Sequence, residues 1–315
     1  MELTGNTFFF PWEASLTEWL QMSLGPSATR VVSFFSAFGE EIVLILILGF
    51  LYWWADKKMG KAVGLSVLMG LVWNPLVKNI FLRRRPYMDH EGIRILRIVA
   101  PEADPLDIAA QGYSFPSGHS TNAAAAYGSL AAALKKKWMT AAAILLPLLV
   151  GFSRVAVGAH YPTDVAVGLL LGVGAMLLVS FLQKRIRNDL LLYGILLLTA
   201  LPGFFYCRSQ DYFDGVGMMI GFMAGALLET RKVGFENTRS ILCGVLRLLG
   251  GFLCYFAVNG ALKAVFSWLG AADGSMAELL LRTVRYAVVT FVEFGVYPLV
   301  FRPLDRLLAC RKREK

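Results

Sequence analysis

The sequence predicts an all-α protein, a polytopic bundle of transmembrane helices. Hydrophobic residues make up 57% of the 315 residues and charged residues only 17%, whereas soluble domains carry about 25% charged residues. Apolar runs long enough to cross a bilayer, about 20 residues each, recur along the chain. These runs are continuous rather than alternating, so helices are expected instead of a closed barrel.

About nine membrane spans are expected, with boundaries good to a few residues. They lie at about 41–54, 62–81, 117–134, 138–155, 163–182, 190–205, 215–228, 242–266 and 279–301. The first run is short, and it gains enough length to cross the bilayer by extending back through 31–35.

A more polar segment precedes the first span. Residues 7–22 mix Phe and Trp with Glu13 and Glu18, which favours an interfacial helix with its Trp side chains at the headgroup level. We therefore divide the chain into three parts. They are an N-terminal interfacial segment (1–37), a helix bundle that holds the polar clusters (38–188), and additional transmembrane helices with a basic tail (189–315).

The charges between the spans predict the orientation. Every odd-numbered span is followed by a basic cluster, such as Lys135, Lys136 and Lys137. Because basic loops stay in the cytoplasm, the C-terminus is expected there, and the loops after the second and fourth spans on the outer side. Five arginines in the loop after the second span oppose this orientation unless they bind an anionic substrate: Arg83, Arg84, Arg85, Arg94 and Arg97.

The net charge of +9 does not indicate a nucleic-acid partner, since most of the excess lies in short clusters beside apolar runs. A polar cluster at the end of the second span contains Lys78 and Arg85. Seven positions are two helical turns, so a continuous helix places both cations on one face, with Arg83 and Arg84 on other faces. Pro86 then ends the helix. The alternative is a pair of basic side chains reaching from a helix end to the interface.

A second cluster, Pro116-Ser117-Gly118-His119, precedes the third span. Pro116 suits the opening of a helix, and free N–H groups of Ser117 and Gly118 would attract an anion at the positive helix end. Glycine allows close approach to the backbone, and His119 can donate a proton to a departing oxygen. The alternative is an ordinary helix cap followed by an interfacial histidine.

A third cluster joins the fourth and fifth spans. It contains Ser153-Arg154, then His160 and, four residues later, Asp164. A carboxylate at this spacing can hold one imidazole nitrogen, which leaves the other free to act as a nucleophile. The alternative is a chance pairing of a loop histidine with a helix-start aspartate.

All three clusters are expected on the same side of the membrane, and two of the three histidines belong to them. The third, His90, has no such partner set and is interpreted as a loop residue. Phosphoryl transfer requires mainly positioning and charge stabilisation, which cations and helix N–H groups supply. The neighbourhood lacks an Asp/Glu cluster suited to Mg²⁺, so no metal and no cofactor are expected.

The three clusters resemble the signature motifs of the type 2 phosphatidic acid phosphatase (PAP2) family: Lys-x6-Arg-Pro, Pro-Ser-Gly-His and Ser-Arg-x5-His-x3-Asp. Here the motifs run from Lys78 to Asp164 without a gap or substitution. The family includes lipid phosphate, polyprenyl diphosphate and sugar phosphate phosphatases. Its usual core has six spans with the motifs after the third and fifth; here they follow the second and fourth, as in the nine-span glucose-6-phosphatase arrangement.

The resemblance implies a role for each residue. His160 would be the nucleophile that forms a phosphohistidine, Asp164 would orient it, and His119 would protonate the leaving oxygen and then activate water. The phosphoryl oxygens would be held by Lys78, Arg85, Ser117, the Gly118 backbone and Arg154.

The expected reaction is therefore metal-independent hydrolysis of a membrane lipid phosphomonoester or diphosphate. Its substrate would be of the polyprenyl diphosphate, phosphatidate or phosphatidylglycerophosphate class. The alternatives are a lipid phosphotransferase, a sphingoid or sugar phosphate phosphatase, a haloperoxidase, and a transporter or scaffold with an inactive site. The expected location is the plasma (inner) membrane, with the site on the extracytoplasmic face.

Several charges are expected deep within the later spans, where an unpaired charge is costly. We hypothesise that Glu293 pairs with one of three arginines and joins the last two spans. The three are Arg247, Arg282 and Arg285.

Overall fold

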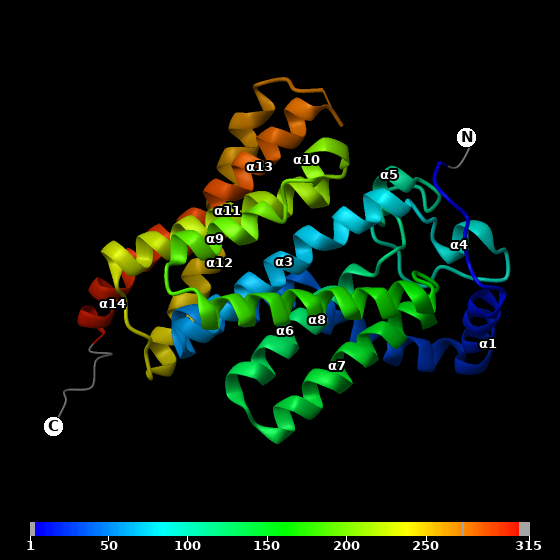
Figure 1. Ribbon diagram of the computed structural model, residues 1–315, viewed down its shortest axis with the longest axis horizontal. Helices are drawn as coiled ribbons and strands as arrows, with labels where there is room; N and C mark the ends of the chain where they lie inside the picture. The colour runs from blue at the N-terminus through cyan, green and yellow to red at the C-terminus, as the bar shows by residue number, and fades with distance from the viewer. Residues whose placement is uncertain (1–3, 273, 309–315) are drawn as a thin grey trace. The chain divides into compact units, whose positions relative to one another are not determined.

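The computed structural model describes residues 4–272 and 274–308, and within these residues it is helical, without β-strands. One isolated parallel bridge joins Asn6 to Arg83. The all-α prediction is thus confirmed (Figure 1). The chain forms two compact units, of which the first comprises Met1–Leu44 and Trp73–Leu178, and the second Ile45–Val72 and Val179–Lys315.

The helices follow the chain order α1 (Pro11–Phe34), α2 (Glu41–Gly49), α3 (Lys57–Phe81), α4 (Pro86–Asp89), α5 (Ile108–Gln111), α6 (Gly118–Leu134), α7 (Lys137–Ala156), α8 (Pro162–Arg185), α9 (Asp189–Leu198), α10 (Gly203–Tyr206), α11 (Gln210–Leu228), α12 (Ile241–Ser267), α13 (Met276–Phe291) and α14 (Phe301–Leu307). Short 3₁₀ or π segments extend several of them: η1 (Phe35–Gly39), η2 (Phe50–Ala55), η3 (Glu229–Val233), η4 (Val292–Val296) and η5 (Tyr297–Val300).

Seven of the described helices are long and apolar enough to cross a membrane, or eight if the bent pair Ser27–Gly39 and Glu41–Ala55 is one span. The count of nine is not confirmed. The difference lies at α6, which has only 17 residues. Its run of small residues, Ala123–Ala126, is buried rather than turned toward lipid.

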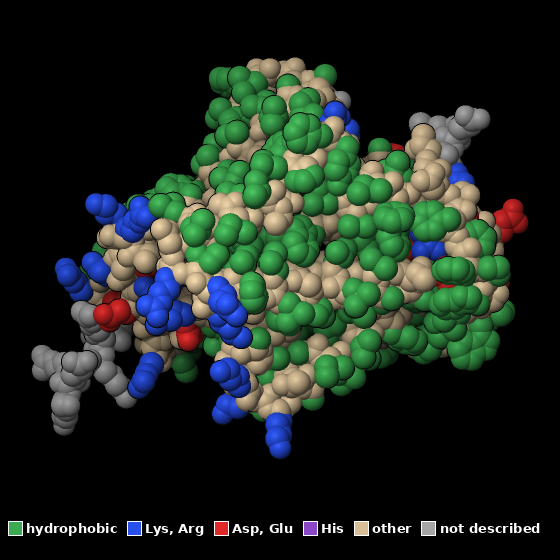
Figure 2. All heavy atoms as spheres, in the orientation of Figure 1, with side chains coloured by type: hydrophobic (Ala, Val, Ile, Leu, Met, Phe, Trp, Pro, Cys, Tyr) green, Lys and Arg blue, Asp and Glu red, His purple; other side chains and the backbone are tan. Residues whose placement is uncertain are grey.

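Large apolar side chains point outward, as expected for helices in lipid. Leu170 and Leu177 of α8 are exposed, and hydrophobic side chains cover much of the face shown in Figure 2. The chain is therefore an integral membrane protein, since such a surface is unfavourable in water.

In the first unit, helix α1 is longer than the segment expected to be interfacial and breaks at Gly25, whose φ is 64°. It buries a polar stripe of Glu13, Thr17 and Gln21 and exposes Trp12 and Trp19. The polar face thus turns into the protein and the aromatic face outward. The location of this helix at the membrane interface, and the three-part division of the chain, remain predictions.

Also in the first unit, α6 and α7 form an antiparallel hairpin (Figure 1), and α8 packs on the N-terminal half of α6. A Cβ atom on Gly168 would lie 2.5 Å from the Ser117 carbonyl oxygen, and one on Gly172 would lie 2.2 Å from that of Thr121. Two glycines one turn apart therefore let the backbones of α8 and α6 touch, as small residues do in membrane helix pairs.

In the second unit, glycines also bring the backbones of α11 and α13 into close contact. Cβ atoms on Gly217 and Gly221 would lie 2.3 and 2.2 Å from the carbonyl oxygens of Thr283 and Ala287. The two helices lie side by side in Figure 1. The later spans thus form a closely packed helix bundle.

The hypothesis that Glu293 pairs with an arginine is wrong. Arg282 binds Asp214, with Nε donating to Oδ1 at 2.9 Å, and Arg247 Nη2 donates to Asp305 Oδ2 at 2.7 Å. Glu293 instead lies next to the thiol of Cys254. Depth in the membrane alone did not identify the partners, because Arg247 and Arg282 reach carboxylates on other helices and Arg285 packs over the ring of Tyr286.

Candidate active site

All eight residues expected at the site belong to the first unit and lie near helix ends. Lys78 is in the last turn of α3, and Arg85 directly precedes α4. Ser117 is the N-cap of α6, followed by Gly118 and His119. Arg154 is in the last turn of α7, His160 precedes α8, and Asp164 is in the first turn of α8.

Electrostatic interactions show that the three motifs converge. The charges of Arg154, His160 and Arg85 act on the imidazole of His119. Those of Arg85, Arg154 and Lys78 act on the imidazole of His160. Each histidine therefore lies among cations contributed by other motifs, as an anion-binding site requires.

The imidazole of His160 faces Asp164, but at a distance longer than a hydrogen bond. His160 Nδ1 lies 3.5 Å from Asp164 Oδ2 and has no hydrogen-bond partner among the described residues. The same Oδ2 accepts a hydrogen bond from the Tyr161 backbone at 2.8 Å. The carboxylate is thus held by the backbone and lies beside the ring that it was expected to orient.

Burial lowers the pKa of His160 well below its usual value, and the positive charges of Arg85, Arg154 and Lys78 lower this pKa further. A neutral imidazole is the form that attacks phosphorus, because protonation occupies the nucleophilic lone pair. The surroundings therefore favour the neutral imidazole of His160, the form that a nucleophilic histidine would need.

Only part of the expected anion site at the start of α6 is available. The Ser117 N–H donates to the Asp164 backbone carbonyl at 2.9 Å, so the prediction that this group is free is wrong: α8 lies too close. The N–H groups of Gly118 and His119 form no hydrogen bond with the described part of the chain. A Cβ atom on Gly118 would meet only Asn74 Oδ1, at 3.8 Å. Packing therefore does not require a glycine at position 118. A glycine there would, however, let an anion approach the backbone closely.

Arg154 is the least satisfied buried cation of the site. Its side chain is 2% exposed, its Nη1 donates one long hydrogen bond to Ser36 Oγ (3.4 Å), and its Nε has no partner in the described residues. A buried guanidinium with one weak hydrogen bond is strongly disfavoured unless an anion shares its site.

Arg85 reaches the site by a different route from the one expected. Helix α3 ends at Phe81 and Leu82 adopts a positive φ of 50°, so Lys78 and Arg85 do not share a helical face. Instead, Arg85 is held by backbone carbonyls, with Nη2 donating to Gln111 at 2.7 Å and Nη1 to Ala159 at 3.1 Å. The helical-spacing argument is therefore wrong, although both residues act on His160.

Two residues at the site were not anticipated: Arg83 and Glu13. Arg83 was assigned to another helix face, yet it is 1% exposed and its Nη1 donates to Asp164 Oδ1 at 2.7 Å. Its Nη2 donates to Glu13 Oε2 at 2.9 Å. The only sequence signals were the triple arginine before Pro86 and the polar stripe that Glu13 begins on an aromatic helix.

His90 follows the short helix α4 and packs its ring against the edge of Phe9, with centroids 4.4 Å apart. Its interpretation as a loop residue outside the motif set agrees with this position. Within the described residues, groups of three or more His, Cys, Asp or Glu that could hold a metal do not occur.

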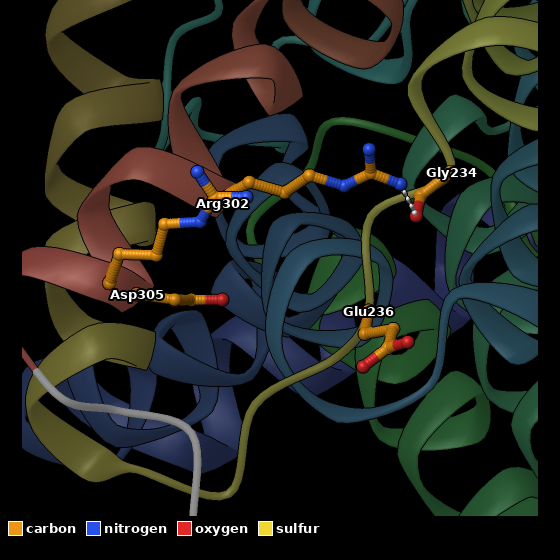
Figure 3. Close-up of a pocket in the computed structure, with 5 residues that line it drawn as sticks. Gly234, Glu236, Arg302 and Asp305 are labelled. Carbon is orange, nitrogen blue, oxygen red and sulfur yellow. Dashed lines mark hydrogen bonds between the residues drawn. The ribbon is translucent and has the colours of Figure 1, made fainter.

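The second unit contains a separate pocket, shown in Figure 3. It is lined by Gly234, Glu236, Arg302, Asp305 and Arg306. Arg302 extends across it and donates to the Gly234 carbonyl at 2.9 Å. The lining lacks a histidine, so this pocket cannot provide the chemistry of the motif residues.

Comparison with known proteins identifies the family. A model of the PAP2 superfamily matches residues 60–188, and a model of the transmembrane extension of PAP2 superfamily phosphatases matches residues 213–311. An undecaprenyl-diphosphatase of Sulfolobus acidocaldarius is 31% identical over 157 residues, which are 49% of this chain and 68% of that protein. The chain belongs to the PAP2 superfamily. It is thus an integral-membrane phosphatase of the PAP2 type.

Two further relatives and one solved structure are also similar to this chain. Undecaprenyl-diphosphatase BcrC of Bacillus subtilis is 31% identical over 43% of this chain and 61% of its own length. Phosphatidylglycerophosphatase B of the same organism is 38% identical over 29% of this chain and 48% of its own length. The crystal structure of a PAP2-type phosphatidylglycerolphosphate phosphatase from Bacillus subtilis aligns with a TM-score of 0.44 at 24% identity, covering 56% of this chain and 87% of that one.

Proposed function

We propose that this PAP2 protein hydrolyses a membrane lipid phosphomonoester or diphosphate through a phosphohistidine at His160. In the first step a nitrogen of His160 attacks phosphorus and the bond from phosphorus to the lipid oxygen breaks. His119, which the negative charge of the bound phosphate keeps protonated, gives its proton to that oxygen. In the second step His119 takes a proton from water, the water oxygen attacks phosphorus, and the bond from phosphorus to nitrogen breaks. The products are inorganic phosphate and a lipid alcohol, or inorganic phosphate and a lipid monophosphate when the substrate is a diphosphate.

The remaining motif residues stabilise the phosphoryl oxygens in this proposal. Lys78, Arg85 and Arg154 supply positive charge, and the N–H groups of Gly118 and His119 supply donors at the positive end of α6. Ser117 caps that helix and positions it, because its backbone N–H is occupied by Asp164.

The buried Arg154 carries the proposal. A guanidinium that is 2% exposed and makes one 3.4 Å hydrogen bond lies beside two histidines and an open helix N-terminus. A phosphoryl group offers three oxygens to such a site, and it can satisfy the guanidinium and the helix donors together.

Polyprenyl diphosphates and glycerolipid phosphates are the substrate classes that we favour. Their phosphate lies at headgroup depth while the tail stays in lipid, which suits a site at the ends of membrane helices. The names of the relatives from Sulfolobus acidocaldarius and Bacillus subtilis, two undecaprenyl-diphosphatases and a phosphatidylglycerophosphatase, fall in these two classes.

The test is phosphate release by the purified protein in detergent, across a panel of polyprenyl, glycerolipid, sphingoid and sugar phosphates with EDTA present. Release from a polyprenyl or glycerolipid substrate is expected, and a labelled acceptor lipid should take up no phosphate. Rapid quenching with a ³²P-labelled substrate should give protein-bound label that is labile in acid and stable in base.

The variant His160→Ala should retain no bound label. His119→Ala should slow lipid release and hydrolysis, because the proton donor is lost. Activity that disappears with EDTA, or label that persists in His160→Ala, would contradict the proposal.

A further inference from the structure

Arg83 lies between two buried carboxylates. Its Nη1 donates to Asp164 at 2.7 Å and its Nη2 to Glu13 at 2.9 Å. The exposed fractions of the three side chains are 1% for Arg83 and 0% for each acid. Such a contact in a low-dielectric interior fixes both position and charge.

Aromatic rings hold the faces of the same guanidinium. Its Cζ lies 3.9 Å from the ring centroid of Tyr161 and 4.8 Å from that of Phe8. Two carboxylates bind the edge of the Arg83 guanidinium and two aromatic rings cover its faces, so these contacts fix its orientation. The carboxylate of Asp164, the neighbour of His160, is therefore held by a rigid partner.

Glu13 connects this arginine to the start of α8. Its Oε1 accepts hydrogen bonds from the backbone N–H of Thr163 at 3.0 Å and from the Thr163 hydroxyl at 2.6 Å. Thr163 directly precedes Asp164. Glu13 thus holds Asp164 in two ways, through Arg83 and through the backbone. It also lies outside the residues matched by the PAP2 family model, 60–188.

Together, Glu13, Arg83 and Asp164 place a net negative charge near His160. Glu13 and Asp164 with Arg83 between them carry a net charge of −1, whereas Arg83 and Asp164 alone would carry none. Cations face His160 from three other elements: Lys78 on α3, Arg85 before α4 and Arg154 on α7. The imidazole of His119 on α6 is its titratable neighbour. A nucleophilic nitrogen becomes positive as it bonds to phosphorus, and among these cations it needs a compensating negative field.

We propose that Glu13 and Arg83 are positioning residues that hold the Asp164 carboxylate against His160, and that Glu13 supplies the net negative charge that supports a phosphorylated imidazole. The inference rests on the proposed phosphohistidine mechanism. It assigns the N-terminal helix α1 a part in the reaction that the three motifs do not contain.

The test compares Glu13→Gln and Arg83→Gln with a control, Gln21→Met. Gln21 is buried on the same helix and binds the Arg94 backbone and the Ala156 carbonyl, so the control removes anchoring of α1 without touching Asp164. The variants are assayed for kcat, KM and the pH dependence of kcat/KM with a short-chain lipid phosphate, and for thermal unfolding in detergent.

We expect Glu13→Gln to lower kcat about 10-fold, with KM within about twofold of the unmodified protein, since the lost interaction acts on the transition state. Removing a negative charge should also move the acidic limb of kcat/KM to lower pH. Arg83→Gln removes a positive charge and should move the same limb to higher pH. Gln21→Met should leave both kcat and the limb unchanged.

The inference would be overturned if the acidic limb of kcat/KM moved in the same direction in both variants, or if it also moved in the control. Looser packing of the site and entry of water would then explain the change. A Glu13→Gln protein with unchanged kcat would do so as well. If Glu13→Gln does not fold, the direction in which the acidic limb moves in Arg83→Gln tests the inference. If neither variant folds, the two residues serve stability alone and the inference is overturned. An inactive unmodified protein, or one without phosphohistidine, would instead overturn the proposed function.

Discussion

At the scale of single residues, two buried arginines of the first unit have opposite surroundings. Arg83 contacts two carboxylates at 2.7 and 2.9 Å, whereas Arg154 makes one hydrogen bond of 3.4 Å to a serine. The charge of Arg83 is neutralised within the protein, so Arg83 can fix the positions of its partners. Arg154 has a single weak hydrogen bond, and in the proposed function it shares its charge with the substrate, because a poorly paired buried cation is costly.

In the proposed mechanism, the pH dependence of the reaction follows from the ionisation of His160. Its pKa lies well below the ordinary value of about 6.5 because of burial and the charges of Arg85, Arg154 and Lys78. Attack requires the neutral imidazole, so the acidic limb of kcat/KM should fall below pH 6.5, and activity should persist into mildly acidic solution. The measurement is kcat/KM from pH 4.5 to 8 with two substrates whose phosphate groups titrate differently, so that the limb common to both reports the enzyme. A common limb at or above pH 6.5 would show that His160 is hydrated in the active protein.

At the scale of helices, the contact between α6 and α8 positions the site. Gly168 and Gly172 let α8 approach so closely that the Ser117 N–H reaches the Asp164 carbonyl at 2.9 Å. Helix α6 carries the turn that binds the phosphoryl group in the proposed function, and α8 carries Asp164. The spacing of these two helices therefore sets the distance between that turn and Asp164.

Gly172→Ala tests this contact, because its Cβ atom would lie 2.2 Å from the Thr121 carbonyl oxygen. The helices must separate, so we expect a destabilisation of about 1–3 kcal/mol and a lower kcat. The matched control is Gly194→Ala on α9, where a Cβ atom has no heavy atom within 4 Å; helix propensity makes that change neutral or stabilising. Thermal unfolding in detergent and phosphate release measure both effects. Equal behaviour of the two variants would show that close packing of α8 on α6 is not needed.

At the scale of the whole molecule, we propose from the loop charges that the motif loops lie on the extracytoplasmic face of the plasma membrane and the C-terminus in the cytoplasm. The basic tail after residue 308 lies outside the described residues. The arginines of the loop after α3 do not contradict this orientation, because several of them are engaged: Arg83 with Asp164 and Glu13, Arg84 with Asp89, and Arg97 with Glu40.

Cysteine labelling in intact cells tests the orientation. Glu91 in the motif loop and Lys136 between α6 and α7 are both exposed. We expect Glu91→Cys to react with a membrane-impermeant maleimide from outside, and Lys136→Cys to react only after the membrane is opened, each above the signal of the unmodified chain. The reverse pattern would place the site in the cytoplasm.

The sequence predicted those features of the site that depend on neighbouring residues. Ser117 caps α6 and Pro162 opens α8, as expected, since proline and N-cap preferences act within one turn. The prediction failed where distant segments decide. The chain leaves the helix at Phe81, and the roles of Arg83 and Glu13 arise from partners 70 and 81 positions apart in sequence. Glu293 shows the same limit, because its depth was predictable and its partner was not.

The contacts of residues 6–13 have a consequence for how the protein is made. The Asn6 side chain donates to a carbonyl 75 positions later, and Glu13 accepts from a backbone amide 150 positions later. During translation, residues 6–13 are synthesised before the residues that they contact. The contacts of Glu13 with Thr163 can therefore form only after the first turn of α8 has been synthesised.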